Sequence, residues 1–153
     1  MTNQLPITDN LYKLSGECHC GNINLDINLS KPPSSFQVRV CDCDFCRKHG
    51  AGFISDVHGS LLISVKHANQ LGHYQQGSSL ADFLFCKKCG VFMAVTFQSG
   101  GQLYSAVNSK AINENVVFGE IVPVSPKLLS ALEKTDRWIN NWFGDVSIQI
   151  LDT

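Results

Sequence analysis

The chain has 153 residues, a formal net charge of −1, and 44% hydrophobic and 16% charged residues. This length suits one domain, residues 1–153, whose core is large enough to fold alone. The near-neutral charge and the absence of long runs of like charge argue against a general nucleic-acid-binding protein.

The N-terminal residues, MTNQLPITDNLYKLSG, lack the basic segment and apolar core of a secretory signal. No apolar stretch approaches the roughly 18 residues that a membrane-spanning helix needs. We therefore expect a soluble, cytoplasmic protein that does not bind a membrane.

Short strand-like segments make up much of the chain. Ile23–Leu29 and Val146–Leu151 alternate apolar and polar positions, which is the period of a half-buried strand. Between them lie segments rich in β-branched and aromatic residues: Phe36–Val40, Leu61–Val65, Ala81–Phe85, Val91–Phe97 and Leu103–Val107. Turn-forming runs such as KPPSS, QQGSS and QSGGQ separate these segments. The pattern predicts a mainly β fold of antiparallel strands.

A minor helical segment is expected near the C-terminus. Ser125 is a candidate N-cap, Pro126 suits the first helical position, and KLLSALEK follows. A further short turn is expected over DRWINNWFG, capped by Asp136 and ended by Gly144. Its two tryptophans, Trp138 and Trp142, share one helical face, which is typical of core residues rather than of ligand-stacking residues.

The seven cysteines fall into three clusters: Cys18-His19-Cys20, Cys41-Asp42-Cys43-Asp44-Phe45-Cys46 and Cys86-Lys87-Lys88-Cys89. An odd number cannot form a full set of disulfides, and cytosolic thiols stay reduced. In an extended segment residues i and i+2 point to one side, so a C-x-C pair can present both sulfurs to one ion. A C-x-x-C pair followed by glycine is typical of a knuckle that holds zinc. Metal binding is therefore favoured.

Counting sulfurs suggests how they divide. Four cysteines complete a tetrahedral zinc site, and the two outer clusters supply Cys18, Cys20, Cys86 and Cys89. The central cluster supplies the other three from a single loop, which predicts a second zinc with an open position for substrate. The alternatives are one four-cysteine site that mixes the clusters, an iron–sulfur cluster, or cysteines that only pack as small apolar residues.

The runs GECHCG, CDCDFCRKHGAGF and FCKKCG resemble the glutathione-dependent formaldehyde-activating enzyme family. This family includes centromere-protein-V-like domains and has an Mss4-like, mostly β fold. The resemblance implies a structural zinc on four cysteines and a three-cysteine zinc that binds the substrate thiol. Two features depart from the family: Asp42 stands where a histidine is common, and LADFLFC lacks the arginine often found before the last cluster. From about Ala111 onward no motif matches.

The expected chemistry follows from the three-cysteine site, Cys41, Cys43 and Cys46, which we expect to be catalytic. Three thiolates make zinc poorly suited to generating hydroxide, but they leave a fourth, incoming thiolate ionised and nucleophilic. This favours addition of a sulfur to a small electrophile such as an aldehyde, or the reversal of that addition. Together with the open site, the family resemblance implies a carbon–sulfur lyase or synthase that acts on glutathione adducts of a small aldehyde, such as S-hydroxymethylglutathione. The alternative is a non-catalytic module that binds a thiol or another protein.

Charged neighbours of the central cluster are further candidates. Arg47 and Lys48 are expected to bind the glutathione carboxylates or, equally, only to balance the charge of the zinc thiolates. Asp42 and Asp44 are expected to accept backbone N–H bonds. His49 is either a proton-handling group or a plain surface histidine.

Overall fold

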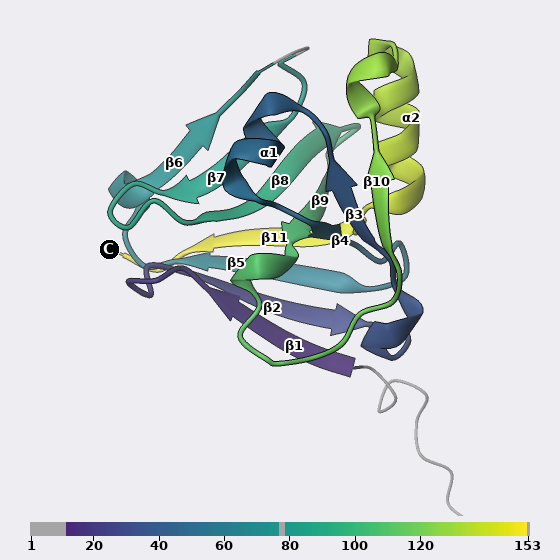
Figure 1. Cartoon of the computed structure of the whole chain (residues 1–153). Helices are drawn as coiled ribbons and strands as arrows, with labels where there is room; N and C mark the ends of the chain where they lie inside the picture. The colour runs from purple at the N-terminus through teal and green to yellow at the C-terminus, as the bar shows by residue number, and fades with distance from the viewer. Residues whose placement is uncertain (1–11, 77–78, 153) are drawn as a thin grey trace, which may run out of the picture.

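The computed structural model describes residues 12–76 and 79–152 (Figure 1). The strands in these ranges are β1 Tyr12–Glu17, β2 Ile23–Leu29, β3 Val38–Cys41, β4 Phe53–Ile54, β5 Ser60–Val65, β6 Leu71–Tyr74, β7 Asp82–Cys86, β8 Phe92–Ser99, β9 Gln102–Asn108, β10 Ile121–Val124 and β11 Asp145–Ile150. The α-helices are α1 Asp44–His49 and α2 Ala131–Asn141, and a 3-10 turn covers Pro126–Leu128. Neither α-helix of the described ranges has the length and apolarity to span a bilayer.

The described strands form two sheets. One is four-stranded, in the order β1-β2-β5-β11, and the other is seven-stranded, in the order β10-β3-β4-β9-β8-β7-β6. Most neighbours are antiparallel, whereas β10 runs parallel to β3 and β11 runs parallel to β5. Both parallel strands come from the C-terminal third, which therefore adds an edge strand to each sheet. The expected mainly β, antiparallel, Mss4-like architecture with few helices is confirmed.

The seven-stranded sheet is covered on both faces. Its first face packs on the four-stranded sheet around fully buried side chains: Ile23, Leu25, Ile27, Leu29, Ile63, Met93, Val107 and Phe143. Its second face carries Phe53, Phe83, Phe92 and Phe97 in a largely aromatic cluster, and two tryptophans of the α2 segment, Trp138 and Trp142, pack against them. Helices α1 and α2 lie on this second side (Figure 1). The sheet thus lies between a core that it shares with the four-stranded sheet and an aromatic layer that the helices cover.

Several strand predictions are close to the observed bounds. β2 has the predicted limits, and the other predicted strands shift by one or two residues at an end. Four short strands were not predicted: β1, β4, β6 and β10. β10 contains Pro123, which is a feature of edge strands because proline cannot donate to a ladder.

The predicted start of the C-terminal helix is wrong. Ser125 and Pro126 begin only a 3-10 turn, because the Ser125 hydroxyl donates to Asp42 Oδ2 at 2.6 Å and caps nothing. α2 begins later, where Ser130 and Glu133 form a reciprocal capping box that satisfies two backbone donors. The helix then runs without a break to Asn141, so Asp136 is an internal residue and not a cap, and the helix ends before Gly144.

Candidate functional site

The first cluster, called the four-cysteine cluster, joins the two sheets. Cys18 and Cys20 follow β1, whereas Cys86 ends β7 and Cys89 lies in the turn before β8. All four sulfurs lie within 4.8 Å of one another. The Cys18–Cys20 and Cys20–Cys86 sulfurs are 3.8 and 3.5 Å apart, close to the roughly 3.8 Å that a tetrahedron with zinc–sulfur bonds of about 2.3 Å requires. The donor set therefore fits a closed zinc site.

Two glycines shape this cluster. Gly21 and Gly90 have φ of 84° and 82°, a backbone region that favours glycine. The N–H groups of Gly21 and Gly90 donate to the carbonyls of Cys18 and Cys86 at 3.0 and 2.8 Å. The tight turns also let Ile23 N–H donate to Cys18 Sγ at 3.2 Å. The two segments thus form two knuckles, C-H-C-G and C-K-K-C-G, whose sulfurs lie close together.

The pKa values of three thiols in this cluster are shifted in different directions. Burial raises the pKa of Cys18 to about 12 and also raises the pKa of Cys86. Burial opposes ionisation of Cys89 as well, but hydrogen bonds from the backbones of Val91 and Cys20 and from neighbouring thiols lower its pKa to about 6. A divalent cation would take the place of the remaining thiol protons.

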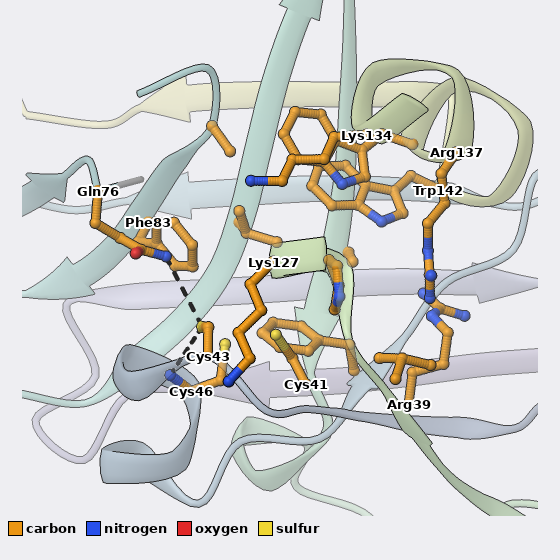
Figure 2. A pocket seen from close by; sticks show the side chains of 17 residues that line it. Arg39, Cys41, Cys43, Cys46, Gln76, Phe83, Lys127, Lys134, Arg137 and Trp142 are labelled. Atoms are coloured by element: carbon orange, nitrogen blue, oxygen red, sulfur yellow. Dashed lines mark hydrogen bonds between the residues drawn. The ribbon is translucent and has the colours of Figure 1, made fainter. Parts of the chain in front are cut away.

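The second cluster, called the three-cysteine cluster, lies on the helical side of the seven-stranded sheet. Cys41 ends β3, Cys43 is the N-cap of α1, and Cys46 lies in the first turn of that helix. Their sulfurs also lie within 4.8 Å of one another. Cys43 Sγ accepts the N–H of Cys46 at 3.4 Å and a bond from Gln76 Nε2 at 3.8 Å (Figure 2). The segment expected to be a loop is therefore a strand end followed by a short helix.

Hydrogen bonds among the three thiols shift their pKa values in different directions. Bonds from the Cys41 and Cys46 thiols lower the pKa of Cys43 far below its ordinary value. The same bonds, with burial, raise the pKa of Cys46 and of Cys41. Cys43 is thus the most acidic of the three thiols, because its pKa is lowered while those of Cys41 and Cys46 are raised. Like the first, this donor set suits a thiophilic cation such as zinc.

The three sulfurs open into a cavity of about 160 Å³, called the cysteine pocket. Its apolar walls include Phe53, Phe83, Val95, Ala106, Trp138 and Trp142. Its polar lining comprises Arg39, Gln76, Lys127, Lys134 and Arg137 (Figure 2). No member of the four-cysteine cluster lines it. The two clusters therefore differ in surroundings: one joins the sheets, and the other faces a pocket that has an aromatic wall and a cationic rim.

Most of the residues that line the pocket were not predicted from the sequence. Arg39 stands two residues before Cys41 on one strand, so the alternation of β3 was a signal that both side chains share a face. Lys134, Arg137 and Trp138 follow helical spacing on α2, but nothing in the sequence tells that α2 covers the cysteines. The two tryptophans belong to the core, as expected, and they also line the pocket.

The structure places Arg47 and Lys48 outside the cysteine pocket. Arg47 Nη2 pairs with Asp44 Oδ1 at 3.1 Å on the exposed side of α1. Lys48 is exposed, on the same helix as His49, whose ring packs against Phe45 at a centroid distance of 4.5 Å. Because α1 is helical, residues next to Cys46 in sequence point away from it. Their role in binding a substrate carboxylate stays a prediction.

Within the described parts of the chain, the two aspartates accept bonds from side chains and not the expected bonds from backbone N–H groups. Asp42 accepts a side-chain bond, from the Ser125 hydroxyl, and lies 3.9 Å from Lys127 Nζ. Asp44 likewise accepts from a side chain, that of Arg47. Asp42 thereby ties the segment after β10 to the three-cysteine cluster and holds Lys127 at the pocket.

Comparison with known proteins decides the family. A model of the glutathione-dependent formaldehyde-activating enzymes matches residues 13–123, which include every cysteine of both clusters. The chain belongs to this family. A crystal structure of a Rhodobacter sphaeroides protein is similar, with a TM-score of 0.54 at 29% identity, over 72% of this chain and 99% of the other.

The match to this family ends before one wall of the cysteine pocket. Lys127, Lys134, Arg137 and Trp142 all lie beyond residue 123, on the 3-10 turn, on α2 and directly after it. The cysteines and β3 belong to the matched part. The sulfur side of the pocket therefore lies within the family match, whereas the opposite wall comes from a segment beyond the matched residues.

Proposed function

We propose that this protein is a zinc-dependent carbon–sulfur lyase or synthase that acts on the adduct of glutathione, or of a similar thiol, with a small aldehyde such as formaldehyde. The observation that carries the proposal is that Cys41, Cys43 and Cys46 converge at the floor of a pocket, apart from the four-cysteine cluster. Membership of the family supports glutathione and formaldehyde as reactants. We place the activity in the cytoplasm, where thiol ligands stay reduced.

Two zinc ions per chain are part of the proposal. Cys18, Cys20, Cys86 and Cys89 would hold one as a structural ion, and Cys41, Cys43 and Cys46 would hold the other. When bound there, zinc supplies Lewis acidity that keeps a substrate thiol ionised at neutral pH, while the sulfur-rich ligand set leaves that thiol nucleophilic.

The residues of the chain supply the rest. Phe83 and Trp142 form apolar walls that exclude water from the reacting atoms. Lys127 and Lys134 bring positive charge to a site that gathers several thiolates. In the forward direction the thiol adds to the aldehyde carbon, a carbon–sulfur bond forms, and the thiol proton ends on the former carbonyl oxygen. The reverse step breaks the same bond, and neither direction needs an oxidant or a reductant.

Exchange spectroscopy tests this proposal, because the adduct also forms without an enzyme. Glutathione and ¹³C-formaldehyde are mixed at equilibrium, and NMR measures how fast label passes between free aldehyde and adduct. We expect the zinc-loaded protein to raise the exchange rate at least about tenfold at micromolar concentration, and the metal-depleted protein to leave it at the buffer value. Saturable glutathione binding with an unchanged exchange rate would contradict an enzyme and would indicate a thiol-binding module instead.

A further inference from the structure

Two arginines lie together at one end of the cysteine pocket. Arg39 comes from β3 and Arg137 from α2, and Figure 2 shows their side chains approaching each other at the end away from Cys43 and Cys46. Burial, and then the positive charge of Arg137, lower the pKa of Arg39 to about 10. The chain thus brings two like charges together in a partly desolvated place.

Neither arginine has an acidic partner within residues 12–76 and 79–152. The salt bridges found there involve Arg47, His73 and Lys127 instead. Arg39 Nη2 donates to a neutral group, the Ser55 hydroxyl, at 2.6 Å. Ser55 in turn donates to the carbonyl of Asn141 at the end of α2, which fixes the Arg39 side chain relative to that helix. Arg39 and Arg137 are both half-buried, and cations that are partly removed from water are normally paired. Two guanidiniums that face a cavity without an acidic partner therefore point to an anionic ligand.

The position of this pair relative to the sulfurs defines the ligand further. Arg39 and Cys41 are residues i and i+2 of β3, so their side chains leave the same face of the strand about 7 Å apart. Phe53 and Trp142 line the pocket with them. A molecule that places its sulfur at the three-cysteine cluster therefore has both guanidiniums in the same pocket.

We propose, on the basis of the proposed function, that Arg39 and Arg137 bind a carboxylate of the substrate and thereby select thiols that carry one. Guanidinium groups match the planar geometry of a carboxylate and bind it with paired hydrogen bonds. The cavity of about 160 Å³ is smaller than the ~300 Å³ of the smallest pockets that enclose a drug-sized ligand. It holds one carboxylate arm of glutathione or a whole small thiol acid, and the rest of a tripeptide lies outside.

Because Arg137 lies beyond the residues that the family model matches, this subsite depends on the C-terminal helix of this chain. The selectivity would therefore be a property that α2 adds to the shared cysteine site.

Calorimetric titration of the zinc-loaded protein tests the inference with two ligand pairs: 3-mercaptopropionate and 4-mercaptobutyrate, each beside its neutral amide. We expect the wild type to bind at least one acid about tenfold or more tightly than the matching amide. Arg137→Gln should reduce this ratio below about threefold without weakening the amide. Arg137→Lys, which keeps the charge but not the forked geometry, should fall between the two. Lys31→Gln removes a charge from an exposed residue that does not line the pocket and should change neither affinity.

The outcomes separate this inference from the proposed function. If the wild type binds acid and amide equally, or if Arg137→Gln keeps the full preference for the acid, the carboxylate subsite is overturned although thiol binding stands. If the wild type binds neither acid nor amide nor glutathione, the proposed function falls and the subsite falls with it.

Discussion

The Cys43→Ser variant is expected to keep its fold but to bind glutathione at least about a hundredfold more weakly than the wild type. Serine is a good N-cap, so its hydroxyl can accept the N–H of Cys46 in place of the sulfur and preserve the start of α1. Serine nevertheless removes the sulfur ligand whose pKa is lowered by hydrogen bonds from the other two cysteines. Because even residues that only support a metal ligand change affinity or activity by ten- to a hundredfold, loss of a ligand should cost at least as much.

Calorimetry with glutathione and zinc analysis of the purified variant check this prediction together. The variant should hold one zinc ion fewer per chain and should melt within a few degrees of the wild type. Unchanged glutathione affinity in a variant that has lost this zinc would show that the thiol does not bind at the three-cysteine cluster.

A cysteine-to-serine substitution in the four-cysteine cluster should instead destabilise the fold. Cys86→Ser is expected to lower the free energy of unfolding by at least about 4 kcal/mol, because a structural zinc site contributes to folding directly. Cys86 is fully buried, and its cluster connects the turn after β1 in one sheet to the β7–β8 turn in the other. Since small domains are stable by only about 5–15 kcal/mol, much of the variant should be unfolded.

Urea denaturation followed by circular dichroism measures this loss, with Cys43→Ser as the matched control, since each variant exchanges one sulfur for one oxygen. If the two variants were destabilised equally, the division into a structural and a substrate-facing cluster would be wrong.

The division of the sulfurs into four and three could be predicted because ligand spacing is a local property. C-x-C in extended chain and C-x-x-C-G in a knuckle bring pairs of sulfurs together within each segment. In the structure, the cysteines of the first and third clusters lie together, as the count of four ligands for one zinc predicted.

The substrate side of the pocket could not be predicted in the same way. Arg47 seemed a candidate because it follows Cys46 in sequence, yet α1 turns it outward to Asp44. The arginines that do line the pocket depend on the parallel pairing of β10 with β3 and on the position of α2. Both are tertiary features that join segments about a hundred residues apart, and neither leaves a periodic signal in the sequence.

Asp42, a local departure from the family motif, contacts a distant segment of the chain. The family often has histidine at this position, and here the carboxylate accepts from Ser125 and approaches Lys127. These contacts connect the C-terminal segment to the loop of the three-cysteine cluster.

The measurement that tests the central claim most directly is the number of zinc ions per chain before and after mild chelation, with the fold followed by circular dichroism. A structural four-cysteine site beside a substrate-facing three-cysteine site predicts two ions that fall to one while the spectrum stays unchanged. A single ion throughout, or the loss of both ions together with the fold, would contradict this account.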